Sequence, residues 1–219
     1  MKLRIASLSL LTILCLALGT TALADDLYNN GPTNGTNDAY FIDVYAVSDS
    51  FIPNSFLYSD IQSFDVALWT PAGATPLTID WAIGTSSFGS DIGSGSGEWG
   101  LTLLCRSGQP FNGGVCGGGF GYDLYDANMS TGSLIVTPGD TYWLTLTGAI
   151  DNFGGRDGWD VNSGHSSAAY HNLLGAIPSE SFTINGHGET TGFVPEPSGI
   201  LLLGSGVLGL AGIVRRKLL

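Results

Sequence analysis

The body of the chain alternates short apolar runs with clusters of Gly, Pro, Asn, Asp and Ser. In the run LTIDWAIG at 77–84, apolar side chains occur at every second position. The apolar face consists of Leu77, Ile79, Trp81 and Ile83. A period of two over such a length predicts a half-buried β-strand.

The same period predicts a set of further strands. SFDVALW (63–69) puts Phe64, Val66 and Leu68 on one face, and YWLTLT (142–147) does the same with Tyr142, Leu144 and Leu146. Other strands are expected in AYFIDVYAV (39–47), EWGLTLL (98–104), GFGYDLY (119–125) and SFTIN (181–185). The turn residues Pro138-Gly139-Asp140 predict a hairpin over 133–146.

Three stretches read as turns or loops. DDLYNNGPTNGTN (25–37) is rich in Asn-Gly and Gly-Pro and has little to bury, and GSDIGSGSGEWG (89–100) and CGGGFGYD (116–123) are glycine-rich connections. Neither glycine-rich stretch is followed by a lysine or a helical pattern, which argues against a phosphate-binding loop.

The body shows no sustained helical period, so the expected fold class is all-β. Eight or nine short strands separated by turns are typical of a β-sandwich, and we expect a jelly-roll-like one over residues 25–193. Four tryptophans fall in strand patterns and are expected to lie mainly in its core: Trp69, Trp81, Trp99 and Trp143.

Residues 1–24 have the features of a secretory signal peptide. Lys2 and Arg4 precede an apolar stretch, and Ala22-Leu23-Ala24 supplies the small residues that signal peptidase reads. Leu14 stands where a lipoprotein would need a small residue before Cys15. We therefore expect signal peptidase to cut before Asp25 and the protein to be exported.

A second apolar segment lies at the C-terminus. Residues 199–214 are uncharged, and as a helix they would measure about 24 Å, at the short end for crossing a bilayer. Arg215, Arg216 and Lys217 follow directly, and positive residues of this kind stay on the cytoplasmic side. A transmembrane helix that leaves the body outside the cell is therefore expected.

Charge excludes several classes of function. The chain has a net charge of −12, and between Asp25 and Val194 its only cations are Arg106 and Arg156. A surface with this much negative charge repels nucleic acid, and no nucleic-acid partner is therefore expected. No pattern in the body requires a cofactor, and none is expected.

Cys105 and Cys116 remain as a pair once the signal segment is removed. An even number of cysteines in an exported chain favours a disulfide between them over a metal site. Closing so short a loop would contribute about 2–3 kcal/mol to stability.

The C-terminal segment resembles the PEP-CTERM sorting signal, which some collections call an ice-binding protein C-terminal domain. The resemblance covers residues 194–219: a Pro195-Glu196-Pro197 motif, the apolar segment 199–214 and the basic tail 215–217. It implies recognition by exosortase, a membrane-embedded transpeptidase of Gram-negative bacteria. It further implies delivery, after a membrane-held stage, to the outer envelope or an exopolysaccharide matrix. The resemblance also implies a sorting role for six residues: Pro195, Glu196, Pro197, Arg215, Arg216 and Lys217.

The body is similar to uncharacterised PEP-CTERM proteins. It shares with them a start like DLYNNGP, a central WAIGTSSFG, and GDTYWLTL followed by WDVNSG. This resemblance implies a fold and no activity.

The polar segment 151–171 offers two candidate sites beside its default interpretation as a hydrogen-bonded surface loop. Asp157, Asp160 and Asn162 could supply oxygen ligands to calcium. Alternatively, Trp159 could stack on a sugar ring while Asp160 and His165 bind its hydroxyls.

No catalytic arrangement stands out. Ser166 and Ser167 adjoin His165 along the chain, which is not how a triad is assembled, and GSGSG (93–97) lacks the strand–helix context of a nucleophile elbow. The sequence favours a non-catalytic envelope or matrix protein. The alternative is a carbohydrate-binding module that acts on exopolysaccharide, with or without the help of calcium.

Overall fold

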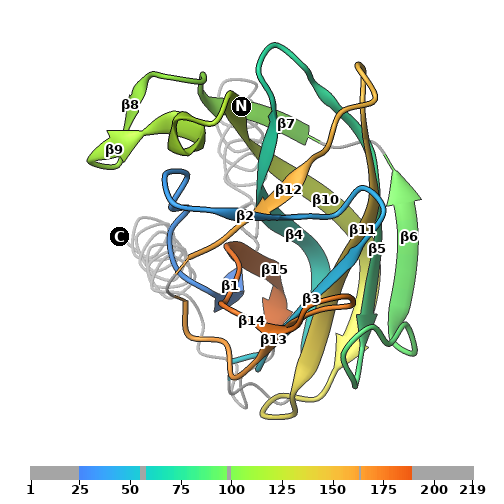
Figure 1. Ribbon diagram of the computed structural model, residues 1–219. Helices are drawn as coiled ribbons and strands as arrows, with labels where there is room; N and C mark the ends of the chain where they lie inside the picture. The colour runs from blue at the N-terminus through green and yellow to red at the C-terminus, as the bar shows by residue number, and fades with distance from the viewer. Residues whose placement is uncertain (1–24, 55–57, 98–99, 163, 189–219) are drawn as a thin grey trace, which may run out of the picture. The chain divides into compact units, whose positions relative to one another are not determined.

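The computed structural model describes residues 25–54, 58–97, 100–162 and 164–188. In these ranges the chain is almost entirely β-strand, with one short 3₁₀ helix, η1 (Cys116–Gly119). The strands form two antiparallel sheets and one two-stranded ribbon (Figure 1).

The first sheet follows the order β1-β15-β4-β10-β7, and β12 and β2 extend it beside β4. Its strands are β1 (Asp25–Asn29), β15 (Phe182–Gly188), β4 (Ser59–Pro71), β10 (Tyr122–Val136), β7 (Gly100–Cys105), β12 (Gly158–Asp160) and β2 (Ala39–Phe41).

The second sheet follows the order β14-β13-β3-β11-β5-β6. Its strands are β14 (Gly175–Ile177), β13 (Ala169–His171), β3 (Ala46–Phe51), β11 (Tyr142–Asp151), β5 (Pro76–Gly84) and β6 (Gly93–Gly97). The small ribbon pairs β8 (Pro110–Phe111) with β9 (Gly114–Val115).

The two sheets pack face to face over one apolar core, as expected for a sandwich. Phe64 of β4 meets Trp81 of β5 edge to face, with 5.8 Å between ring centroids. Phe51 of β3 meets Phe182 of β15 in the same way at 6.2 Å. The alternation predicted for β4, β5 and β11 places their apolar residues in this core.

Leu77 is an exception to the predicted alternation. It is 47% exposed, although Ile79, Trp81 and Ile83 are buried. The pairing of β5 with β11 is irregular where Ile150 faces Thr78 and Asp151 faces Pro76. At this end of β5 the alternation is interrupted, so Pro76 is buried and Leu77 is exposed.

A second, smaller core lies on the outer face of β4. It contains Ala67, Trp69 and Leu124 together with the two cysteines. Cys105 and Cys116 are joined by a disulfide, as the sequence predicted. Trp69 therefore belongs to a separate cluster beneath the disulfide loop, while Trp81 lies in the main core.

Three sequence-based expectations about elements are wrong. Residues 133–146 do not form a hairpin, because β10 and β11 belong to different sheets and the turn carries the chain across. Gly93–Gly97 is a strand instead of a loop. The segment 25–37 begins with strand β1, and its Leu27 and Asn30 are fully buried.

The signal segment 1–24, Trp99 and the C-terminal segment 189–219 lie outside the described residues. The predicted transmembrane helix at 199–214 falls in that last segment. Within the ranges that are described, no helix has the length and apolarity needed to cross a membrane.

Candidate functional site

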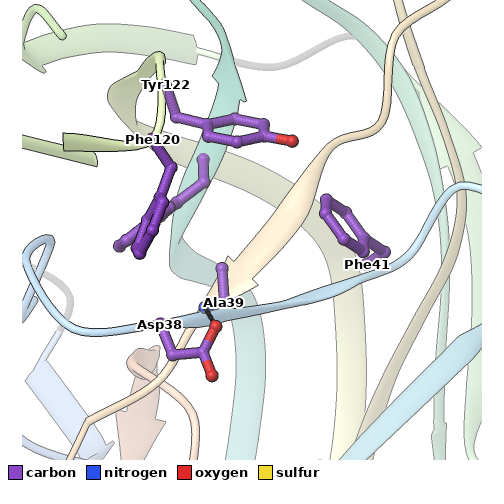
Figure 2. A pocket seen from close by; sticks show the side chains of 6 residues that line it. Asp38, Ala39, Phe41, Phe120 and Tyr122 are labelled. Carbon is purple, nitrogen blue, oxygen red and sulfur yellow. Dashed lines mark hydrogen bonds between the residues drawn. The ribbon is translucent and has the colours of Figure 1, made fainter. Parts of the chain in front are cut away.

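An aromatic cleft opens on the outer side of the first sheet, next to the disulfide loop. Its volume is about 410 Å³. Side chains from three segments line it: Asp38, Ala39, Phe41, Trp69, Phe120 and Tyr122. Figure 2 shows Phe120 and Tyr122 on one side of the opening and Asp38 and Phe41 on the other.

The rings of the cleft lie close to one another. Tyr122 is 6.0 Å from Trp69 and 6.3 Å from Phe41, measured between ring centroids. Phe120 is 71% exposed, so its ring is presented to solvent instead of being packed. An open cleft with several aromatic walls and one carboxylate, that of Asp38, has the composition of a small-molecule binding site.

Close backbone packing and the disulfide fix the segment that forms one aromatic wall of the cleft. Gly117 and Gly118 of η1 have φ angles of 65° and 59°, which favour glycine. A Cβ on Gly117 would lie 2.2 Å from the backbone oxygen of Tyr122. This close approach and the Cys105–Cys116 bond fix the segment that carries Phe120 and Tyr122.

Asp160 anchors the floor of the cleft. Its Oδ1 accepts hydrogen bonds from Trp69 Nε1 at 2.7 Å and from the Gly35 amide at 2.8 Å. Its Oδ2 accepts one from the Asn34 amide at 2.7 Å. Burial raises the pKa of Asp160 to about 6, although these hydrogen bonds oppose the rise. The carboxylate predicted to bind a ligand is thus used to position Trp69 and the 34–35 turn.

The predicted sugar platform does not form around Trp159. This side chain is 0% exposed and packs edge to face on Phe182, with 5.7 Å between centroids. Its Nε1 donates to the Ser181 carbonyl at 2.8 Å. Asp160 is also buried, whereas His165 is exposed, so the three predicted sugar contacts share no surface. The expectation was wrong because β12 lies inside the sheet, between β2 and β4.

The predicted calcium ligands do not come together either. Asn162 donates to the Asn30 carbonyl and accepts from the Gly164 amide, both at 2.8 Å. Both carboxylate oxygens of Asp160 already accept hydrogen bonds, three in total. Asp157 lies on the opposite side of β12 from Asp160, because the two are separated by an odd number of positions. A site made of Asp157, Asp160 and Asn162 is therefore excluded by the fold.

Buried acidic side chains are the feature that sequence reasoning missed. Asp49 and Glu180 are both fully buried, and Asp49 Oδ2 accepts from the Glu180 amide at 2.7 Å. Burial raises the pKa of Asp49 to about 6. Burial, and then the negative charges of Asp49, Asp160 and Asp38, raise the pKa of Glu180 well above its usual value. Asp49 follows a buried Ser48 in a strand, and this local sequence does not predict that the Asp49 side chain is buried.

Asp157 belongs to a separate buried group. It is fully buried, and burial raises its pKa to about 7, with further increases from the charge of Asp151 and then of Asp43. The Thr70 hydroxyl beside it opposes the rise.

Comparison with known proteins identifies the C-terminal segment. Residues 193–217 match the PEP-CTERM protein-sorting motif. No curated protein and no solved structure matches the chain. The chain is therefore a PEP-CTERM domain-containing protein, and this motif indicates an exported protein that exosortase processes.

Proposed function

We propose that this protein is a non-catalytic component of the outer envelope or extracellular matrix of a Gram-negative bacterium. The single observation that carries the proposal is the sorting motif at 193–217. The signal-like segment 1–24 and the acidic body support it, because both suit an exported protein. Signal peptidase, exosortase and, transiently, the membrane are its expected partners.

A motif variant tests the sorting step. Replacing Pro195, Glu196 and Pro197 together with alanine should keep the protein in the membrane fraction and remove it from the culture medium and outer envelope. The matched control is Thr190→Ala with Thr191→Ala, just outside the motif. Equal distribution of the motif variant and the control would overturn the proposal.

The second candidate function is carbohydrate binding, and the aromatic cleft is the observation that favours it. Aromatic rings provide flat faces for a sugar ring, and Asp38 could accept hydrogen bonds from its hydroxyls. The acidic charge of the chain favours a neutral or amino sugar over an acidic one. The proposed contacts are Phe41, Phe120 and Tyr122 instead of Trp159.

Affinity electrophoresis through gels that contain neutral exopolysaccharide from the host tests this candidate. Phe120→Ala should abolish retardation at little cost in stability, because the ring is 71% exposed. Phe153→Ala is the matched control, because its ring is 67% exposed and does not line the cleft. Retardation that survives Phe120→Ala and Tyr122→Ala would exclude the cleft.

We also infer that the sandwich has jelly-roll topology. Strands β1-β15-β4-β10 of one sheet face β3-β11-β5-β6 of the other. The chain crosses between the sheets from β3 to β4, from β4 to β5 and from β10 to β11, as two interlocked Greek keys require.

A further inference from the structure

Where β11 ends and β12 begins, several buried side-chain oxygens lack a well-formed hydrogen bond, although the Thr70 hydroxyl acts on the Asp157 carboxylate. In the part of the chain that the structure describes, they are Asp43 Oδ1, Thr70 Oγ1, Asp151 Oδ2 and both carboxylate oxygens of Asp157. Thr70, Asp151 and Asp157 are each at most 2% exposed. A buried polar group without a partner is rare in proteins and points to an unseen water or ion.

The pairing of the strands brings these groups together. Gly158 of β12 pairs with Trp69 of β4, so Asp157 lies next to Thr70. The Ile42 amide donates to the Asp157 carbonyl at 3.0 Å, which places Asp43 beside the same residue. The charges of Asp151 and Asp43 both act on Asp157, the Asp151 charge more strongly.

In Asp151 and Asp43, the second carboxylate oxygen is already held by a partner. Asp151 Oδ1 accepts from the Phe153 amide at 2.6 Å and the Gly155 amide at 2.9 Å. Asp43 Oδ2 pairs with Arg156 Nε at 3.1 Å. Each carboxylate is thus fixed by one oxygen and directs the other into the interior.

An interior group of this kind must be neutralised. Burying a charged carboxylate without a partner is costly, so such a group either takes up a proton or is paired with a positive occupant such as a cation. Arg156 contacts Asp43 and is half exposed, with its guanidinium 4.6 Å above the Phe41 ring. It is therefore directed toward solvent and the cleft instead of toward Asp157.

We propose that Asp151, Asp157 and Thr70 bind a calcium ion, with backbone carbonyls and water completing its coordination. Among the described residues, no three acidic, cysteine or histidine side chains are gathered as metal ligands. The proposed site accordingly uses two carboxylates and one hydroxyl, while Asp43 contributes negative charge from nearby. Calcium takes six to eight oxygen ligands in irregular geometry, whereas magnesium needs a near-ideal octahedron. This inference does not depend on the sorting or sugar-binding proposals.

Thermal unfolding of the purified full-length protein, first treated with a chelator and then dialysed, tests the site. About 10 mM CaCl₂ should raise Tm by roughly 3–10 °C, as expected for a site of extracellular affinity in a protein of this size. The same concentration of MgCl₂ should have a much smaller effect.

Three variants locate the site. Asp157→Asn and Thr70→Val should each lose most of the calcium shift, and both keep the volume of the native side chain. Asp140→Asn is the control, because it removes the same charge from an exposed turn and should keep the full shift. Without calcium, Asp157→Asn should melt at or above the wild-type temperature, because it removes a buried acid.

Two results would overturn the proposal. One is a wild-type Tm that calcium leaves unchanged, which would mean that protons and not calcium neutralise the buried carboxylates. The other is an equal calcium shift in Asp157→Asn and the wild type, which would place calcium elsewhere on the acidic surface.

Discussion

Asp160 shows how one buried carboxylate organises the surface above it. Three donors from separate segments converge on its two oxygens: the Trp69 indole and the amides of Asn34 and Gly35. The charged carboxylate can satisfy all three because it has four acceptor positions. The cleft thus depends on a residue that no ligand can reach.

Asp160→Ala should lower the free energy of unfolding by about 2–4 kcal/mol, because it leaves three buried donors without an acceptor. Urea unfolding measures this loss, and Asp140→Ala serves as the surface control. A loss below about 1 kcal/mol would show that water replaces the carboxylate without difficulty.

The interior acids predict an unusual dependence of stability on pH. The pKa of Asp49 rises from 3.8 to about 6 and that of Glu180 rises well above its usual value, so the unfolded chain loses these protons first. The contribution of these two acids to the free energy of unfolding is complete below about pH 4. It is lost as the pH rises through their pKa values in the folded protein. A rise of two pKa units corresponds to roughly 3 kcal/mol.

In the presence of a chelator, the free energy of unfolding should therefore fall between about pH 4 and pH 7. Glu180→Gln should make this fall smaller and stabilise the protein at pH 8, since it removes a charge that faces Asp49, Asp160 and Asp38. Urea unfolding across this range is the measurement. A free energy that increases with pH would contradict the assignment.

The sequence predicted residue types more reliably than residue positions. It located the disulfide partners because an even cysteine count in an exported chain leaves one pairing. It misplaced Trp159, because polar neighbours along the chain do not reveal that β12 is covered by β2 and β4. The walls of the cleft come from segments around positions 40, 69 and 120, and only the folded sheet brings them together.

At the scale of elements, β6 shows that a glycine-rich segment can be a necessary strand. Gly95 pairs with Trp81, and a Cβ at this position would lie 2.9 Å from Trp81 Nε1. The strand has no side chain to bury at this point, so the indole ring occupies the space. The absence of side chains is also why the sequence suggested a loop.

Gly95→Ala should destabilise the protein by about 1–3 kcal/mol, because Trp81 must move within a packed core. Gly97→Ala is the matched control in the same strand, where the nearest atom to a Cβ would be Met129 Cε at 4.0 Å. Chemical denaturation of both variants measures the difference. Equal stabilities would mean that the ring has room to move.

The hairpin error at 133–146 has a similar origin. Pro138-Gly139-Asp140 does make a turn, in which the Asp140 amide donates to the Thr137 carbonyl at 3.4 Å. Local turn chemistry does not determine whether the next strand pairs with the previous one or crosses to the opposite sheet. That choice depends on the long-range pairings of β10 with β4 and of β11 with β3 and β5.

At the scale of the whole molecule, the chain consists of an acidic β-sandwich and a C-terminal sorting motif. The sandwich class was predictable from the period-two pattern, and the motif from three features in order near the C-terminus. The ligand of the cleft was not predictable, because it depends on surfaces that exist only after folding.

Intact-mass spectrometry of the protein from its host, with membrane and medium analysed separately, tests the central claim most directly. We expect a form in the medium that begins at Asp25 and ends near Pro195–Pro197, with the Cys105–Cys116 bond formed. A protein that keeps Arg215–Leu219 in every fraction would contradict it and make the tail a permanent anchor.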